Sequence, residues 1–265
     1  NAALPELDAL RAAVHLHQTG KLADADALYR RILAANPRHA DAMHLRGVLA
    51  YQAGDAASAV TLIGNAIKLK NSTPAYHANF ALALMQLGRF DEALHSSETA
   101  LRLKPDYADA HLHRAATLKA LQRPSEALAA CDAALRFNPA FAEAHNNRGN
   151  LLTSLGRIDE ALAAYEAAVR VRANFAEAHC NRGNALNALG RLDEAVAAYD
   201  TAISAMPNFT EPHFGKARLL AQRGHLAEAA SSYEGILSLF PHNYEAYGEL
   251  GNVLMDLGRM EEALE

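Results

Sequence analysis

Residues 141–174 read FAEAHNNRGNLLTSLGRIDEALAAYEAAVRVRAN, and residues 175–208 repeat this pattern as FAEAHCNRGNALNALGRLDEAVAAYDTAISAMPN. The two stretches align without a gap, and alanine, glycine and tyrosine recur at the same places. A fixed period of this length is typical of repeat proteins, in which each repeat buries its apolar face against its neighbours. The sequence therefore predicts a fold built by stacking copies of one unit.

The period extends through the whole chain. Glycine recurs at the same place of most repeats, proline ends most of them, and one alanine is present in every repeat. The alanine series is Ala25, Ala59, Ala93, Ala127, Ala161, Ala195, Ala229 and Ala263. The repeats are 6–39, 40–73, 74–107, 108–141, 142–175, 176–209, 210–243 and a shorter 244–265. We expect residues 1–265 to form a single solenoid.

Within one repeat the pattern indicates two helices joined by a turn. In repeat 176–209, AEAHCNRGNALNAL contains good helix formers and is closed by Gly190, a typical residue beyond a helix end. The second stretch, LDEAVAAYDTAISA, begins with two acids that suit the positive end of a helix, and Pro207 stops it. No stretch indicates a strand, so the predicted fold is all-α.

Composition excludes several classes of protein. The residues are 51% hydrophobic, enough for a sizeable core, and the formal net charge is only -5. This balance disfavours binding to nucleic acid or to a membrane surface, since both require a strongly basic face. Cys131 and Cys180 form no disulfide framework, which fits a cytoplasmic protein. The sequence also lacks a long apolar run and an N-terminal secretory pattern, so we expect no membrane span and no signal peptide.

The order of small residue, glycine, large apolar residue, alanine, aromatic residue, alanine and proline resembles the tetratricopeptide repeat (TPR). The resemblance covers residues 6–265 and implies a right-handed superhelical solenoid whose first helices line an inner groove. Ser97 and Cys131 depart from the pattern by replacing a large residue, and Gln122 replaces the turn glycine. We expect looser packing in those two repeats and an unchanged register.

The groove implied by this resemblance carries a series of asparagines. A carboxamide both donates and accepts hydrogen bonds, so a series of them can pair with the backbone of an extended peptide of any sequence. The alternative is that these amides solvate the groove or cap neighbouring helices. Asparagine is a poor interior helix residue, however, and its recurrence needs a compensating reason. The candidate peptide-binding residues are Asn79, Asn147, Asn150, Asn181, Asn184, Asn187 and Asn252.

An acidic series lies one turn before the asparagines. Its members are Asp41, Asp109, Glu143, Glu177, Glu211 and Glu245. Such a series favours a peptide that carries Lys or Arg. Its position in the first turn of each first helix also suits the helix dipole, and the two explanations are compatible. Members of the family that bind a C-terminal carboxylate use Lys and Arg here, so the series disfavours that kind of site.

Histidine and basic residues form two further series. His77, His111, His145, His179 and His213 share one place of the repeat. Equivalent places on packed helices are about 10 Å apart, too far to share a zinc ion, so we expect half-buried structural imidazoles and no metal site. Arg46, Arg114, Arg148, Arg182 and Lys216 follow the asparagines, and we expect them to pair across repeats with the acidic series. No catalytic motif or phosphate-binding loop is present, which predicts a non-enzyme without a cofactor.

The segments FAEAHNNRGNLL (141–152) and FAEAHCNRGNAL (175–186) further resemble the repeat arm of O-linked N-acetylglucosaminyltransferases and their bacterial relatives. That resemblance implies that Asn79, Asn147 and Asn181 hold the backbone of a substrate polypeptide. Four other residues interrupt the series at this place: Leu45, His113, Gly215 and Glu249.

We therefore expect a non-catalytic module that binds extended protein segments in its groove, as the substrate-recognition arm of a larger glycosyltransferase. The alternative is a self-associating assembly scaffold. The short repeat 244–265 lacks a following helix, and we expect the apolar face left open there to favour association.

Overall fold

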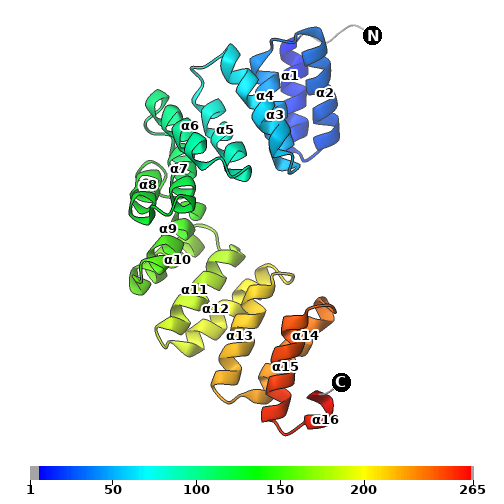
Figure 1. The fold of residues 1–265 in the computed structure, drawn as a ribbon, viewed down its shortest axis with the longest axis vertical. Helices are drawn as coiled ribbons and strands as arrows, with labels where there is room; N and C mark the ends of the chain where they lie inside the picture. Colours follow the sequence, from blue (N-terminus) through cyan, green and yellow to red (C-terminus); the bar gives the residue numbers. More distant parts are fainter. Residues whose placement is uncertain (1–5, 264–265) are drawn as a thin grey trace. The chain divides into compact units, whose positions relative to one another are not determined.

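The computed structural model describes residues 6–263, and every regular element in that range is an α-helix. In chain order the helices are α1 (Glu6–Gln18), α2 (Leu22–Ala35), α3 (Ala40–Gln52), α4 (Ala56–Leu69), α5 (Pro74–Gln86), α6 (Phe90–Leu103), α7 (Ala108–Ala120), α8 (Pro124–Phe137), α9 (Ala142–Ser154), α10 (Ile158–Val171), α11 (Ala176–Ala188), α12 (Leu192–Ala205), α13 (Thr210–Gln222), α14 (Leu226–Leu239), α15 (Tyr244–Asp256) and α16 (Met260–Ala263) (Figure 1). The predicted all-α fold is confirmed. Across the described range, none of these helices has the length and apolar character needed to span a bilayer.

The helices pack in successive pairs, with the odd-numbered helix first and the even-numbered helix second in each repeat. Each pair also packs against the next within two compact units. The N-terminal unit is Asn1–Pro139 and the C-terminal unit is Ala140–Glu265. The predicted solenoid of helix pairs is thus confirmed within each unit, and a single solenoid over 1–265 stays a prediction.

The turn between paired helices depends on one residue in left-handed backbone conformation. Gly190 has φ +73°, and the turn closes with a hydrogen bond of 2.9 Å from the Arg191 N–H to the Leu186 carbonyl. Glycine adopts this conformation at little cost because it has no Cβ. Gln122 takes the same conformation, with φ 58°. The register therefore survives this substitution, as the sequence predicted, at the expense of backbone strain.

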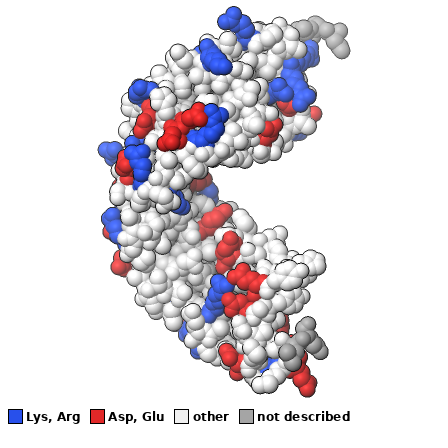
Figure 2. Space-filling model, viewed as in Figure 1, with Lys and Arg blue, Asp and Glu red and all other residues white. Residues whose placement is uncertain are grey.

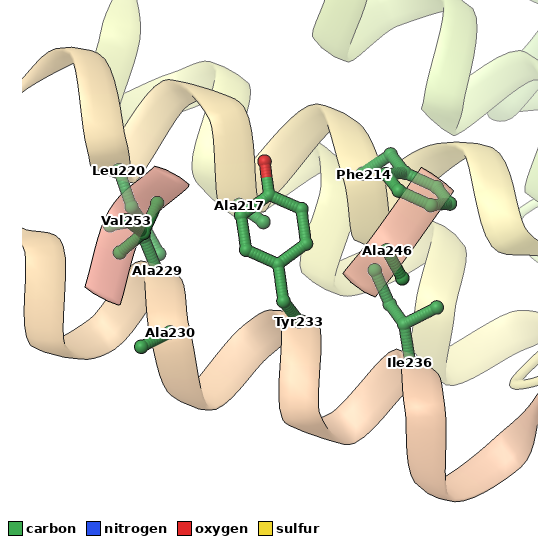
Figure 3. Close-up of a cluster of buried hydrophobic side chains, with 9 residues drawn as sticks. All are labelled: Phe214, Ala217, Leu220, Ala229, Ala230, Tyr233, Ile236, Ala246 and Val253. Carbon is green, nitrogen blue, oxygen red and sulfur yellow. The ribbon is translucent and has the colours of Figure 1, made fainter. Parts of the chain in front are cut away.

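Small residues let paired helices approach closely. Ala161 and Ala195 are fully buried. A Cβ on Gly183 would lie 2.6 Å from a ring carbon of Tyr199, so only glycine leaves room for this ring. Figure 3 shows a related arrangement at the next repeat, where Tyr233 of α14 points toward α13 beside Ala217. The tyrosine rings of the second helices thus extend beneath the first helices.

Candidate peptide-binding site

The C-terminal unit brings five of the predicted asparagines together on two neighbouring first helices. α9 carries Asn147 and Asn150, and α11 carries Asn181, Asn184 and Asn187. The two helices are in contact, and these five asparagines are half-buried except for Asn184, which is exposed. We call these five residues the amide patch. Its carboxamides are accessible enough to bind a partner and constrained enough to hold a direction.

Buried tyrosines orient two members of the patch. The hydroxyl of Tyr165 donates to Asn150 Oδ1, and the hydroxyl of Tyr199 donates to Asn184 Oδ1, each at 2.8 Å. Burial raises the pKa of Tyr199 to about 12, so this phenol stays protonated and can only donate to the carboxamide oxygen. With the oxygen occupied, each asparagine keeps its Nδ2 group as a donor for a bound molecule.

A lateral hydrogen bond fixes a third member. Asn181 Nδ2 donates to Asn146 Oδ1 across the two first helices at 3.0 Å. This leaves Asn181 Oδ1 as an acceptor, whereas the side chain of Asn147 makes no hydrogen bond to the described residues. Sequence reasoning missed Asn146, although its place directly before Asn147 was a usable signal. The patch therefore offers both donors and acceptors, as a peptide backbone requires.

Asn79 and Asn252 lie outside the patch. In the N-terminal unit, Asn79 Nδ2 donates to His44 Nε2 at 3.0 Å, the same kind of lateral bond that Asn181 makes. Burial lowers the pKa of His44 to about 4, so its imidazole is neutral and able to accept. Asn252 is exposed on α15 and is separated from the patch by α13 in the helix order.

The patch ends at α13 for two local reasons. Gly215 stands at an asparagine place, and a Cβ there would lie 2.7 Å from Cζ of Tyr199, so a side chain would have to displace the ring. Arg218 stands at the place of Asn150 and Asn184 and binds Glu249 at 3.0 Å and Glu245 at 2.7 Å. Charged pairs thus replace the carboxamides beyond α11.

The acidic series is partly used within the protein. Asp41 accepts a hydrogen bond from Tyr76 and lies 3.6 Å from Lys70, and Glu143 pairs with Arg172. Glu245 pairs with Arg218, as described above. Asp109, Glu177 and Glu211 have no ion-pair partner among the described residues. Figure 2 shows acidic side chains gathered on the surface of the C-terminal unit, in the lower part of the view.

Comparison with models of known protein families identifies the family of this chain. Models described as tetratricopeptide or TPR repeats match residues 79–142 and 214–265, 130–163, 149–190 and 176–209, together more than half of the chain. The chain is a tetratricopeptide repeat protein. A model described as anaphase-promoting complex, cyclosome, subunit 3 matches residues 18–100. A search of curated protein sequences finds no match.

Solved structures share the TPR fold. PilF of Pseudomonas aeruginosa superimposes with a TM-score of 0.65 at 18% identity, covering 72% of this chain and 86% of that chain. YrrB, described as a TPR protein with an unusual peptide-binding site, gives 0.56 at 22% identity and covers 69% and 95%. A thermophilic TPR protein of Thermus thermophilus gives 0.59 at 25% identity and covers 69% and 99%. Identities as low as those of PilF and YrrB establish a common fold and nothing further.

The histidine series of this TPR protein has a structural role. In four repeats the Nε2 atom donates to the backbone carbonyl six residues earlier, in the loop that enters the first helix. The pairs are His77 with Asn71 at 2.8 Å, and His111 with Pro105, His179 with Ala173 and His213 with Pro207 at 2.9 Å. The expected structural imidazoles are confirmed at these places. Within residues 6–263, no cluster of His, Cys, Asp or Glu has an arrangement that could hold a metal ion.

The prediction for the basic series was wrong about its partners. Four of these five side chains pair across TPR repeats with acids on the second helix of the preceding repeat and not with the acidic series. The pairs are Arg46 with Asp26 at 2.9 Å, Arg114 with Glu98 at 3.4 Å, Arg182 with Glu166 at 3.9 Å and Lys216 with Asp200 at 2.6 Å. A residue one place after an asparagine is rotated by about 100° around the helix and so faces the second helices.

Proposed function

We propose that this TPR protein is a non-catalytic module that binds extended polypeptide segments through the amide patch. The observation that carries the proposal is the orientation of Asn150 and Asn184 by buried tyrosine hydroxyls. Each bond satisfies a buried phenol hydroxyl and also holds the accepting carboxamide in one direction. A fixed Nδ2 donor binds a peptide carbonyl without the entropic cost of ordering the side chain on binding.

The spacing of the patch suits one peptide conformation. Packed helix axes lie about 8–10 Å apart, which sets the distance between equivalent asparagines on α9 and α11. A polyproline II segment turns once every three residues and rises about 9.3 Å per turn, with no internal hydrogen bonds. Carbonyl groups three residues apart therefore recur at the spacing of the two Nδ2 donors. We infer that the patch binds about two turns of such a segment.

Flanking charge extends the proposal to the composition of the segment. Glu177 and Glu211 lie in the first turns of α11 and α13 and have no ion-pair partner among the described residues. Exposed carboxylates close to the patch favour a segment with Lys or Arg through electrostatic attraction, which acts mainly on the association rate. Asp109 and Glu143 contribute less, since Asp109 lies on α7 of the N-terminal unit and Glu143 pairs with Arg172.

The test compares two sets of asparagine substitutions. Asn147, Asn150, Asn181 and Asn184 are changed together to Ala, and binding of fluorescein-labelled twelve-residue peptides of Ala, Ser, Pro and Lys is measured by anisotropy. Loss of several hydrogen bonds should weaken binding at least about tenfold while helicity is unchanged. The matched control changes four exposed asparagines outside the patch to Ala: Asn65, Asn138, Asn174 and Asn208. Equal affinity of the two variants would remove the patch from the account.

The role as the substrate-recognition arm of a larger glycosyltransferase belongs to the same proposal. It rests on the resemblance of residues 141–152 and 175–186 to such arms, and the interruption at Gly215 limits the patch to a short segment. Residues 1–265 alone should bind peptide without consuming a sugar nucleotide. Turnover of UDP-N-acetylglucosamine by this chain would contradict the non-enzymatic assignment. The cytoplasm is the proposed location, because both cysteines are buried and lie in different units.

Self-association is the second candidate function. α15 exposes two aromatic side chains one turn apart, Tyr244 (84% accessible) and Tyr247 (51%), and α16 exposes Met260 (66%). Exposed apolar side chains close together favour contact with a partner or a second copy. Light scattering over a concentration series distinguishes the two functions. A molar mass that rises with concentration supports a scaffold, and a constant monomer mass supports the binding module alone.

A further inference from the structure

The N-terminal unit has a mainly apolar pocket, and Asn79 is one of the residues that line it. The pocket has a volume of about 190 Å³ and is lined by Val48, Tyr51, Gln52, Ile63, Asn79 and Leu82. Val48 and Leu82 stand at the place that Asn150 and Asn184 occupy in the C-terminal unit. None of the lining residues is charged.

A single substitution in the repeat pattern accounts for this pocket. Ile63 of α4 stands where other repeats have Tyr29, Tyr165, Tyr199 and Tyr233. The hydroxyls of Tyr165 and Tyr199 reach the asparagine side chains of the facing first helix. Ile63 is fully buried but shorter than tyrosine, so it cannot fill the space beside Val48 that a phenol would occupy.

The pocket has the size and polarity for one aliphatic side chain. An apolar cavity of about 150 Å³ is large enough to bind benzene, so 190 Å³ accommodates the side chain of leucine. The walls are formed by Val48, Ile63 and Leu82 with the ring of Tyr51. Because these walls are apolar, burial of an apolar group in the pocket is favourable, and burial of a charged group is unfavourable. The pocket should therefore bind aliphatic side chains in preference to charged ones.

Two carboxamides stand beside the apolar walls. Asn79 Nδ2 donates to His44 Nε2 at 3.0 Å, which leaves the Asn79 oxygen available as an acceptor. Gln52 Oε1 is 2.8 Å from His17 Nε2, so its Nε2 group remains available as a donor. One acceptor and one donor at the pocket match the N–H and C=O of a peptide residue whose side chain enters it.

We propose that this pocket is a specificity site of the N-terminal unit that binds a leucine-sized aliphatic side chain of a polypeptide. The pocket selects one kind of side chain, whereas the amide patch of the C-terminal unit contacts only the backbone of a bound segment. The inference rests on the proposed function in one respect, since it assumes that the natural ligand is a polypeptide. The pocket itself is a property of the N-terminal unit and is tested separately from the patch.

The test uses a variant that the repeat already accommodates. Ile63→Tyr places a ring where Gly47 faces it, as Gly149 faces Tyr165 and Gly183 faces Tyr199. The ring should fill the pocket from below without unfolding the repeat. The double variant Val48→Asn with Ile63→Tyr also restores the tyrosine–asparagine pair of the C-terminal unit. Far-UV circular dichroism and thermal melting confirm folding of both variants.

The first measurement is methyl NMR with N-acetyl-leucine methylamide as the probe and its alanine counterpart as the control. The leucine probe should shift the methyl resonances of Val48, Ile63 and Leu82, and the alanine probe should leave them unchanged. Ile63→Tyr should lose the response at Val48 and Leu82, and the double variant, in which Val48 is replaced, should lose the response at Leu82. The variant with all four patch asparagines changed to Ala should keep it. Absence of any shift in the wild-type protein up to the solubility limit of the probe overturns the pocket.

The second measurement uses the labelled twelve-residue peptides with one central guest residue. The leucine peptide should bind the wild-type protein about tenfold or more tightly than the alanine peptide, and Ile63→Tyr should abolish the difference. Equal binding of the two peptides to the wild-type protein contradicts the proposed role of the pocket and does not affect the proposed role of the patch. Unchanged binding after the four-asparagine substitution contradicts the proposed role of the patch. The proposed role of the pocket then depends on the methyl NMR result.

Discussion

Replacing Tyr165 and Tyr199 by phenylalanine removes the two hydroxyls that orient the patch and keeps the rings that fill the core. Each hydroxyl donates to a carboxamide oxygen at 2.8 Å. A hydrogen bond contributes about 0.5–1.5 kcal/mol net, and the released carboxamides are accessible to water, so the lower end of this range applies. The double variant should therefore lose about 1 kcal/mol of stability, or about 2–4 °C in Tm.

The same change should have a larger effect on binding. Without its tyrosine partner, each carboxamide rotates in the free protein and must be ordered when a peptide binds. Ordering one side chain at an interface costs about 0.5–1.5 kcal/mol, so loss of both tyrosine hydroxyls should weaken peptide binding about tenfold. Anisotropy with the labelled peptides and thermal melting by circular dichroism measure the two effects independently.

Tyr29→Phe is the matched control for this experiment. Tyr29 has the same place in its repeat, but its hydroxyl lies 3.3 Å from Nδ1 of His17 and contacts no asparagine. The control should lower Tm slightly and leave peptide affinity unchanged. If Tyr165→Phe with Tyr199→Phe also lowers Tm at unchanged affinity, the hydroxyls serve only the core and the reasoning is refuted.

Three further predictions concern stability. Burial lowers the pKa of His44 from 6.5 to about 4, so the unfolded chain takes up a proton before the folded one, and stability falls from pH 6.5 to pH 4. The loss should reach about 3 kcal/mol in urea titrations, and His44→Gln should lose less over this range. Ala195→Leu should overpack a fully buried contact and cost about 1–3 kcal/mol; an undiminished Tm would show that the repeat register is wrong. Gln122→Gly should add about 1 kcal/mol by relieving its positive φ, and a lower Tm would contradict this account of the turn.

The sequence was sufficient for the features that depend on one repeat alone. The turn at Gly190 and the burial of Ala195 follow from helix chemistry and from the period. The helix pairs follow for the same reason, because each repeat must bury its own apolar face. The departure at Gln122 was also visible as a break in the pattern. The departure at Ile63 was missed, because isoleucine is itself a large apolar residue, and the pocket beside it depends on how far a missing ring would have reached.

Contacts between repeats could not be read from the sequence. The bond from Asn181 to Asn146 and the bond from Asn79 to His44 join residues 35 apart, a spacing set by the offset between neighbouring helices. Lys216 pairs instead with Asp200, 16 residues earlier on the preceding second helix. Charge pattern alone gave no basis for choosing between this acid and the acidic series, because both are within one repeat of the lysine.

The central claim is that oriented carboxamides hold the backbone of a bound segment. The most direct measurement follows the side-chain 15N–1H resonances of Asn147, Asn150, Asn181 and Asn184 while the labelled peptides are added. We predict downfield shifts of the Nδ2 protons of Asn150 and Asn184 that saturate together with the anisotropy signal. Saturated peptide binding with these resonances unchanged would contradict the claim.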